Sequence, residues 1–507
     1  MMVESWLPIL VFAIPTICGV ISLSFRRASA LFHSVIAVLG LAGTFAISVA
    51  ITSDVLRGNV LVALNNAVYA DGLSALMELL GSCMGMLVAI YSIRYIPIHV
   101  ARRPDAPQRL STYYGLLLLF LGMMNWTCVT NSIVWLYVTL EATTLATVFL
   151  VTFYWERRSL EAGYKYFMLV TIGIIFSLFG LVLIYSGAVE LPEMQGRDVL
   201  LITELSRIGR KIPRSVVLLA NALLIAGFGA KAGLVPFHAW LPDAHAEAPA
   251  PISALLSGIV IKVGAYAIAR TATIFAPQYP PIIVFIAIMA SLSMVVGILM
   301  ALVQDDIKRM LAYSSVSQIG YVVEGLGLGT YLGIYGGLFH LANHTIVKAL
   351  LFLSAGAVAH VTGTRKMSEL GGLVHRMPVT AVCFFIGALA IGGLPPFNVF
   401  MSKFTLFAAV ADAGLIWAAV IAVFTGLLTV ACFVRAAMRI FWGKPSEITQ
   451  AALAYANGGE GRLPMSMVIP MVLLAILTVV IGLYPGLIHP LLDSATECIL
   501  KVLRGAF

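Results

Sequence analysis

The stretch Lys231-Ala-Gly-Leu-Val-Pro236-Phe-His238 places a lysine, a glycine and a proline at the end of a long apolar run. Proline removes a backbone hydrogen-bond donor and clashes with the preceding helical turn, so we expect a helix to break near Pro236. A lysine at the centre of a membrane-spanning helix costs about 2.5–3.5 kcal/mol on insertion scales. The stretch therefore predicts a broken membrane helix whose ammonium group serves a function.

The composition of the whole chain agrees with a membrane location. Of the 507 residues, 61% are hydrophobic and only 11% are charged, and the mean hydropathy is +1.00. A soluble protein would need a very large apolar core to carry so few charges. Each membrane span needs about 20 apolar residues, and about 14 runs reach that length. They lie at 5–25, 30–53, 71–94, 112–129, 131–154, 161–188, 215–238, 249–275, 281–303, 307–329, 331–361, 378–410, 414–441 and 465–489. We predict an all-α polytopic membrane protein with about 14 transmembrane helices.

A second helix break is predicted in the run at 378–410, five runs after the first. Its sequence Gly392-Gly-Leu-Pro395-Pro396-Phe397 is followed by Lys403. Two interrupted helices in corresponding positions, each with a lysine nearby, are typical of the paired repeats of membrane transporters. The alternative is that proline and glycine are simply common in membrane helices.

The charged connections predict the orientation of the chain. The net charge of +8 comes from basic residues between apolar runs, which favours anionic lipids as partners and not nucleic acid. If the first run is an uncleaved span with an outer N-terminus, alternation places both termini outside and most basic connections in the cytoplasm. The basic connections are Arg26/Arg27, Arg94–Arg109, Trp155–Arg158, Lys308/Arg309, Arg365–Arg376 and Arg439–Lys444. The connection at 189–214 also contains basic residues and is the exception.

The six cysteines are scattered singly along the chain. They form no Cys-x-x-Cys motif and no Cys/His pair with metal-binding spacing. Neither a disulfide framework nor an iron–sulfur site is therefore predicted. Any redox chemistry is expected in another chain.

Glu141 is an acid within the run at 131–154. It lies about 15 Å deep, which is half the hydrocarbon thickness. An isolated carboxylate there would take up a proton, whereas a nearby ammonium group would keep it ionised. Lys165, early in the next run, is expected to supply that charge across a helical hairpin. The alternatives are a structural role for Glu141 and a Lys165 that reaches the cytoplasmic interface.

Glycines flank two of the lysines, in Gly227-Phe-Gly-Ala-Lys231-Ala-Gly and Gly258-Ile-Val-Ile-Lys262-Val-Gly. Small residues allow close helix approach or water beside the ammonium group. Burial favours a neutral amine and a nearby acid favours the ammonium form, so a moving acid could load and unload a proton. The alternative is a buried amine with a merely structural role.

His340, His344 and Lys348 are spaced four residues apart, so they share one helix face at steps of about 6 Å. Neutral histidine both donates and accepts a proton, which suits a relay through water. Metal ligation by two histidines is the competing interpretation, and no third ligand is evident. The other alternative is that both histidines are structural core residues whose hydrogen bonds are satisfied.

Lys403, after the Pro395-Pro396 break, is predicted to be an exit site with access to one aqueous side. Two further groups of charges are interpreted as connections between spans. The first is expected to be solvated, and the second is expected to lie in a loop with a coupling role. The groups are Asp305, Asp306, Lys308 and Arg309, and then Asp243, His245 and Glu247.

Three motifs resemble the Mrp-antiporter-like subunits of respiratory complex I and of group 4 membrane-bound NiFe hydrogenases. They are the segment from Lys231 through Trp240-Leu-Pro-Asp-Ala-His-Ala-Glu-Ala-Pro-Ala-Pro to Gly258, His344-Thr-Ile-Val-Lys348-Ala-Leu-Leu-Phe-Leu-Ser-Ala-Gly, and Gly393-Leu-Pro-Pro-Phe. The resemblance covers roughly residues 70–440. The sequence Asp243-Ala-His-Ala-Glu-Ala-Pro-Ala-Pro is most similar to that of hydrogenase-4/formate-hydrogenlyase-type subunits. The chain is expected to lack the lateral helix that extends the distal complex I subunit.

The resemblance implies two inverted five-helix repeats, helices 4–8 and 9–13, in which helices 7 and 12 are broken at Pro236 and at Pro395 and Pro396. The implied segments are an N-terminal three-helix segment (1–111), a first repeat (112–275), a second repeat (281–441) and a C-terminal helix and tail (442–507). The family's proton-transfer residues fall on Glu141, Lys165, Lys231, Lys262, His340, His344, Lys348 and Lys403.

The expected function is that of a proton-translocating subunit without a redox site of its own. The resemblance implies membrane and peripheral partner subunits, with a NiFe centre and iron–sulfur clusters in those partners, in the inner membrane of a prokaryote. Electron transfer in the partners would shift the Glu141/Lys165 pair and release protons along the lysines. One rival is a subunit of a secondary Na⁺/H⁺ antiporter, in which sodium is also moved. Another is an inert scaffold that anchors redox subunits.

Overall fold

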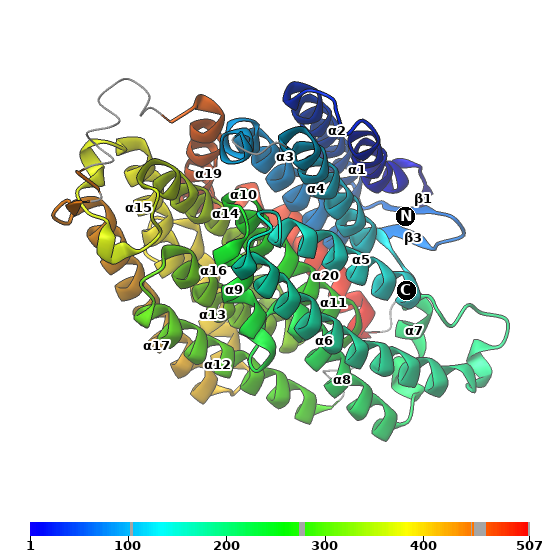
Figure 1. Cartoon of the computed structure of the whole chain (residues 1–507). Coiled ribbons are helices and arrows are strands. Elements are labelled where there is room, and N and C mark those ends of the chain that lie inside the picture. Colours follow the sequence, from blue (N-terminus) through cyan, green and yellow to red (C-terminus); the bar gives the residue numbers. More distant parts are fainter. Residues whose placement is uncertain (102–104, 273–278, 448, 451–462, 505–507) are drawn as a thin grey trace.

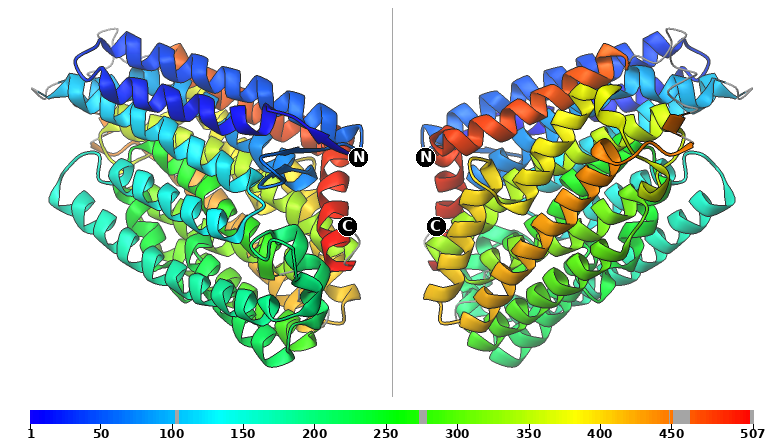
Figure 2. Two further views of the ribbon diagram at one scale, coloured as in Figure 1. Left: turned by 90° about the vertical axis from the view of Figure 1, so that its right-hand side faces the viewer. Right: turned by 90° about the vertical axis from the view of Figure 1, so that its left-hand side faces the viewer.

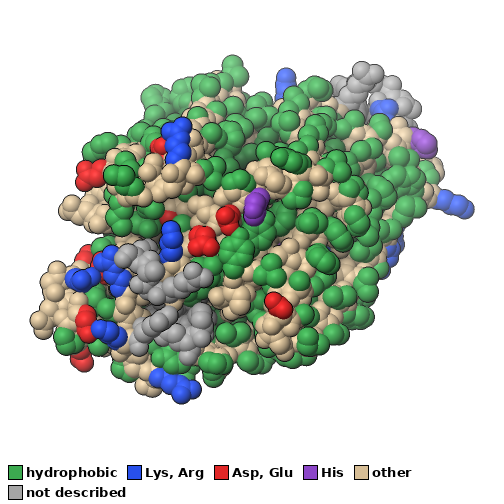
Figure 3. All heavy atoms as spheres, turned by 180° about the vertical axis from the view of Figure 1, so that it is seen from behind, with side chains coloured by type: hydrophobic (Ala, Val, Ile, Leu, Met, Phe, Trp, Pro, Cys, Tyr) green, Lys and Arg blue, Asp and Glu red, His purple; other side chains and the backbone are tan. Residues whose placement is uncertain are grey.

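The computed structural model describes residues 1–101, 105–272, 279–447, 449–450 and 463–504, which form a bundle of long helices (Figure 1). Hydrophobic side chains dominate the flank shown in Figure 3. Twelve helices of the described residues are long and apolar enough to cross a membrane. The prediction of an all-α polytopic membrane protein is confirmed, and the chain is a multi-pass membrane protein.

The helices follow one another in three groups along the chain. The first six are α1 (Leu7–Ser24), α2 (Ala30–Leu56), α3 (Gly72–Val100), α4 (Ala106–Val129), α5 (Ile133–Val151) and α6 (Arg157–Val189). The next five are α7 (Ile202–Ile208), α8 (Arg214–Ala232), α9 (Trp240–Glu247), α10 (Ala250–Leu255) and α11 (Ile261–Thr271). The last are α12 (Pro280–Val303), α13 (Ile307–Gly327), α14 (Tyr331–Thr362), α15 (Pro378–Gly392), α16 (Asn398–Asp412), α17 (Ile416–Ala437), α19 (Met465–Leu483) and α20 (His489–Arg504).

Each of the predicted apolar runs lies on helix, but length and composition identify fewer spans than the sequence predicts. The more polar α13 is not among the twelve long apolar helices, and α15 and α16 have 15 residues each. A count of about 14 spans, the inverted repeats and the segment limits therefore stay predictions. The predicted limit at 275 and parts of the 442–507 tail lie outside the described residues.

A small sheet, which the prediction does not include, closes one end of the bundle. Its strands are β1 (Met2–Glu4), β2 (Val60–Ala63) and β3 (Val68–Ala70). β1 pairs in parallel with β2, and β2 pairs antiparallel with β3. The amphipathic α20 lies at the same end, called here the termini face (Figure 2). The opposite end, called here the basic face, contains the connections 25–29, 152–156, 304–306 and 363–377.

Both interrupted helices end in the same way. α8 ends before Gly233, whose φ is +78°, and α15 ends before Gly393, whose φ is +86°. Only glycine adopts this left-handed conformation without steric cost. In each case the next two N–H groups bond to carbonyls of the last turn, at 2.8 and 3.2 Å after α8 and at 2.9 and 3.2 Å after α15. The last carbonyls are thus capped, and the chain restarts as a helix beyond the prolines.

Close helix crossings bring α8 against α11, and Gly264 is the contact point. A Cβ atom at Gly264 would lie 2.6 Å from the Ala232 amide nitrogen and 2.8 Å from the Phe228 carbonyl oxygen. We therefore expect Gly264→Ala to lower the free energy of unfolding by about 1–3 kcal/mol, because the backbones must separate. Thermal unfolding in detergent measures this effect. Gly43→Ala is the control, since a Cβ atom at Gly43 would meet nothing within 4 Å. Equal midpoints for the two variants would contradict the crossing.

Candidate functional site

The ammonium group of Lys231 is fully buried beside the first helix break. It donates hydrogen bonds to Thr144 Oγ1 at 2.8 Å and to Tyr166 Oη at 3.4 Å. Thr147 Oγ1 and Tyr166 Oη lie 2.7 Å apart. Lys231 thus binds hydroxyl groups of α5 and α6 and has no ion-pair partner within 4.0 Å among the described residues.

Glu141 lies one helical turn from Thr144 on α5, so its carboxyl group neighbours the Lys231 site. Glu141 Oε1 accepts a hydrogen bond from Thr171 Oγ1 at 2.7 Å. Its Oε2 is buried and has no hydrogen-bond partner among the described residues. Glu141 is therefore placed to act on Lys231 electrostatically.

The expected contact of Glu141 with Lys165 is wrong. Lys165 Nζ lies 2.8 Å from Glu161 Oε1 and 3.3 Å from Asp243 Oδ2, and its side chain is 46% exposed. Lys165 is near the start of α6, at the basic face, so it reaches the rim of the bundle as a snorkelling lysine does. The structure supports the interfacial alternative for this residue.

Lys262 and His344 form the central contact of the site. Both are fully buried, and Lys262 Nζ lies 2.5 Å from His344 Nδ1. Lys262 Nζ also donates to the carbonyl oxygen of Ser257. Ser257 belongs to a π-helical turn, Leu256–Val260, and such turns are frequent at functional sites. An amine bonded to an imidazole nitrogen can share one proton with it, because either group can be the donor.

Lys348 is two turns from His340 and one turn from His344 on α14, and it is fully buried. Its Nζ donates to the Leu311 carbonyl at 2.9 Å and to Ser314 Oγ. Next to Ser314, Ser315 Oγ lies 2.7 Å from Ser257 Oγ. Adjacent serines of α13 thus contact Lys348 and Ser257, and serine hydroxyls both donate and accept.

His340 joins the centre of the site to the second helix break. The His340 and His344 ring centroids are 6.2 Å apart. His340 Nδ1 lies 3.1 Å from Ser402 Oγ, and Ser402 adjoins Lys403. Lys403 Nζ donates to the Ile391 and Gly392 carbonyls, at 2.9 and 3.2 Å, at the end of α15. A cation at a helix C-terminus is favoured by the helix dipole, which explains how the break holds this ammonium group.

The structure thus buries six of the eight predicted proton-transfer residues, leaves Glu141 half-buried beside the Lys231 site and leaves Lys165 at the rim. No direct hydrogen bond joins Lys231 to Lys262 in the part of the chain that the structure describes. The described residues contain no group of three or more His, Cys, Asp or Glu side chains that could hold a metal ion.

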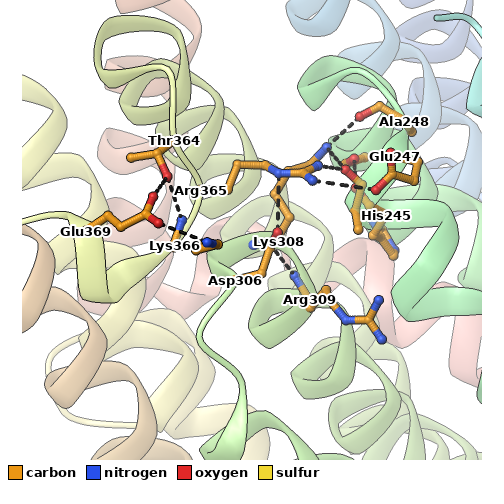
Figure 4. Close-up of polar contacts among 12 residues, drawn as sticks. His245, Glu247, Ala248, Asp306, Lys308, Arg309, Thr364, Arg365, Lys366 and Glu369 are labelled. Carbon is orange, nitrogen blue, oxygen red and sulfur yellow. Dashed lines mark hydrogen bonds and ion pairs between the residues drawn. The ribbon is translucent and has the colours of Figure 1, made fainter. Parts of the chain in front are cut away.

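The prediction that the charges between α12 and α13 are solvated is wrong for Lys308. Lys308 is 4% exposed and its Nζ donates to the Ala246 and Ala248 carbonyls, at 3.2 and 2.5 Å. Arg365 approaches the same segment and lies 3.5 Å from Glu247 Oε1 and 3.2 Å from Asp306 Oδ2 (Figure 4). Lys308 thus caps carbonyl groups at the end of α9, and Arg365 pairs with one carboxylate from α9 and one from the start of α13.

The prediction of a loop at Asp243, His245 and Glu247 is also wrong, because these residues lie on α9. His245 is fully buried, and neither ring nitrogen has a hydrogen-bond partner among the described residues. Its ring stacks on Phe352, with centroids 4.6 Å apart, and Phe352 is one turn beyond Lys348 on α14. The helix after the break thus carries a buried histidine toward the central lysines.

A cavity of about 820 Å³ opens at the basic face, and its lining includes His99, Glu247, Lys308 and Arg365. Two other lining residues contact Glu369: Thr364 Oγ1 donates to Glu369 Oε2 at 2.5 Å and Lys366 lies 2.9 Å from Glu369 Oε1 (Figure 4). These two contacts hold the pKa of the Glu369 carboxyl group below its ordinary value. The cavity gives water access to the buried Lys308.

Three buried charged features were missed in the sequence. Glu78 on α3 is fully buried, Glu324 on α13 is 2% exposed, and Asp71 pairs with Arg270 at 2.6 Å. Glu78 and Glu324 are single acids within apolar runs, which is the signal that identified Glu141. Asp71 and Arg270 lie in distant parts of the chain, so no local sequence pattern predicts their ion pair.

A comparison with protein families matches residues 130–429 to the model of the "NADH:quinone oxidoreductase/Mrp antiporter, TM" family. The match covers more than half of the 507 residues. The chain belongs to this family.

The chain is similar to proteins named for different kinds of complex. It is 35% identical to the hydrogenase-4 component F homolog of Methylacidiphilum infernorum over 74% of this chain and 79% of that protein. It is 32% identical to one of the Na(+)/H(+) antiporter subunits of Alkalihalophilus pseudofirmus, over 94% of this chain and 93% of that protein. A chain of the membrane-bound sulfane sulfur reductase, an archaeal respiratory membrane complex, superposes with a TM-score of 0.85 at 28% identity and 99% coverage of both chains. The family member is an antiporter-like membrane subunit, and structural neighbours of this kind belong to multi-subunit complexes.

Proposed function

We propose that this chain is the proton-translocating membrane subunit of a redox-driven complex. The observation that carries the proposal is the 2.5 Å contact between the fully buried Lys262 and His344. This contact lies in a series of buried amines, hydroxyls and imidazoles between the two helix breaks. Each of these groups can hold or pass a proton.

The proposed route has an entrance, a centre and an exit. Protons enter from the cavity at the basic face, whose lining includes Lys308 and Glu247, and His245 lies two residues before Glu247 on α9. They reach the central lysines and leave through Lys403 at the second break. In chain order the proposed proton-transfer residues are Glu141, Lys231, Lys262, His340, His344, Lys348 and Lys403. Lys165 contributes from the rim, where its ion pair with Asp243 anchors α9 against α6.

Electrostatic coupling between buried charged groups drives the movement of protons along the route. Two charges about 7–10 Å apart at an effective dielectric constant of about 20 interact by about 2 kcal/mol. This energy corresponds to more than a tenfold change in a proton-binding constant. A change of charge at Glu141 therefore shifts the proton occupancy of Lys231, and the shift passes along the lysines.

We expect Glu141→Gln and Lys231→Ala each to lower proton translocation by more than about tenfold, because each removes a coupled charge. Lys165→Ala removes an exposed ion pair, which is worth about 0.2–1 kcal/mol, so the loss is expected to be less than about fivefold. The measurement is dye-detected acidification of sealed vesicles that contain the assembled complex, driven by its electron donor. Proton translocation at the wild-type rate by both Glu141→Gln and Lys231→Ala would contradict the proposal. The chain would then be a scaffold that anchors redox subunits.

The proposal includes the setting of the chain. The basic face is cytoplasmic and both termini are on the outer side of a prokaryotic inner membrane, as the positive-inside rule favours. Other membrane and peripheral subunits carry the NiFe centre and iron–sulfur clusters that drive transport. The hydrogenase-4 relative and an NADH-quinone oxidoreductase relative, 33% identical over 82% of this chain, support a hydrogenase or complex I-like assembly.

A secondary Na⁺/H⁺ antiporter subunit is the second candidate. It is supported by the Na(+)/H(+) antiporter relative, which matches 94% of this chain. Vesicle transport measured with and without sodium, and with and without an electron donor, separates the two functions. Acidification that requires sodium but no electron donor would favour the antiporter.

A further inference from the structure

Glu78 is a buried acid that the lysine route does not use. Its side chain is 0% exposed, and neither carboxylate oxygen has a hydrogen-bond partner among the described residues. An ionised carboxylate in such a place costs several kcal/mol unless a cation pairs with it. A bound proton removes the charge and also gives the group an O–H donor.

The neighbouring helix offers an acceptor for that donor. Asn125 on α4 is buried, and its Oδ1 also lacks a hydrogen-bond partner in the described part of the chain. This oxygen lies 3.7 Å from the position that a Cβ atom of Gly81 would occupy. Gly81 is three residues beyond Glu78, on the same face of α3. Both facing helices thus carry buried acceptor atoms without a donor, and a protonated Glu78 would add an O–H donor beside them.

A buried ion pair lies above Glu78, nearer the termini face. Arg270 donates to both carboxylate oxygens of Asp71 at 2.6 Å and to Ser74 Oγ at 2.9 Å. Asp71, Ser74 and Glu78 are three and four residues apart, so they share one face of α3. A cavity of about 20 Å³, lined in part by Arg270 and Tyr69, lies beside the pair. That volume accommodates one water molecule.

A row of three side chains on α11 connects the Asp71–Arg270 ion pair to Lys262. Lys262, Tyr266 and Arg270 are four residues apart, on one face of α11 and about 6 Å from one to the next. Tyr266 Oη accepts from Arg270 Nε at 2.9 Å and donates to the Cys128 carbonyl at 2.7 Å. Cys128 is one turn beyond Asn125 on α4, so Tyr266 reaches the helix that faces Glu78.

We propose that Glu78 holds a proton and carries it along a branch from Lys262 to the termini face. This inference rests on the proposed function of the lysine route. The Lys262 ammonium gives its proton, through water beside Tyr266, to an ionised Glu78. Glu78 then releases a proton to water at the termini face and is ready for the next. Arg270 keeps its own proton throughout, and its pair with Asp71 limits the outer end of the branch to single-file water.

The test compares Glu78→Gln, Glu78→Asp and Glu190→Gln in the assembled complex reconstituted in sealed vesicles. Gln keeps the shape of Glu78 but cannot bind and release a proton. Asp keeps the carboxyl group on a shorter side chain, so Glu78→Asp shows whether the site tolerates a substitution that can still bind a proton. Glu190→Gln removes an exposed acid from the end of α6 and is the matched control. Infrared difference spectra report the C=O band of protonated carboxylic acid, and dye quenching reports translocation.

We expect Glu78→Gln to lose one protonated-acid band and to lower translocation by at least about fivefold, whereas Glu78→Asp and the control retain both. An unchanged band in Glu78→Gln would overturn the claim that Glu78 holds a proton. Wild-type translocation by Glu78→Gln, while Lys262→Met fails to pump, would overturn the branch and leave the proposed function standing. Wild-type translocation by Lys262→Met would instead remove the proposed function itself.

Discussion

Replacing Lys262 by methionine is expected to lower proton translocation by about a hundredfold or more. Methionine keeps much of the volume of the side chain but has no proton to share with His344. The two nitrogens lie 2.5 Å apart, and the thioether of methionine cannot donate a proton in this contact. Removal of a positioned proton-transfer group typically costs 10²–10⁴-fold, an order-of-magnitude range from enzymes. Dye-detected acidification of vesicles, normalised to electron transfer, measures the loss.

The control for Lys262→Met is Lys211→Met, which removes an exposed lysine between α7 and α8 with 54% side-chain exposure. We expect the control to pump at the wild-type rate. Co-purification of the partner subunits with each variant separates lost pumping from lost assembly. If Lys262→Met assembled and kept more than about half of the pumping, the central amine would not be on the route.

The second large effect is expected for Asp71→Asn, which leaves the buried guanidinium of Arg270 without its carboxylate. Removing one partner of a buried ion pair typically destabilises a protein by about 3–5 kcal/mol, because the remaining charge is desolvated and uncompensated. We expect a loss of this size in the free energy of unfolding, measured by thermal or denaturant unfolding in detergent.

Replacing both partners tests the reason for that loss. Apolar side chains of similar volume in place of a buried ion pair are often neutral or stabilising, so Asp71→Leu with Arg270→Met is expected to recover most of the stability. A single variant as stable as the wild type would contradict the buried pair. A double variant no better than the single one would show that packing, and not charge, accounts for the loss.

The broken helices were predictable because their signals are local. Gly233 and Gly393 adopt left-handed conformations, and the prolines that follow cannot continue a helix. The face shared by His340, His344 and Lys348 also follows from helical spacing alone. The helix positions could therefore be predicted from the sequence, whereas the count of spans depends on α13 and on the short α15 and α16.

The partners of the charged groups were less predictable because they depend on how distant segments meet. Lys165 binds Asp243 because α9 packs against α6 after the first break. Lys308 is buried because carbonyls of the α9–α10 connection cover it. Asp71 and Arg270 are 199 residues apart in the chain. In contrast, Glu78 could have been found, since an acid alone in an apolar run is a functional signal wherever it occurs.

A map of the assembled complex at a resolution that shows bound water tests the central claim most directly. The claim is that buried amines and imidazoles conduct protons between the two helix breaks. The decisive place is the interval between Lys231 and Lys262, where the side chains make no direct hydrogen bond. The account predicts ordered water that joins the two ammonium groups and continues past His344 toward Lys403. A dry interval, filled by apolar side chains in every state of turnover, would contradict it.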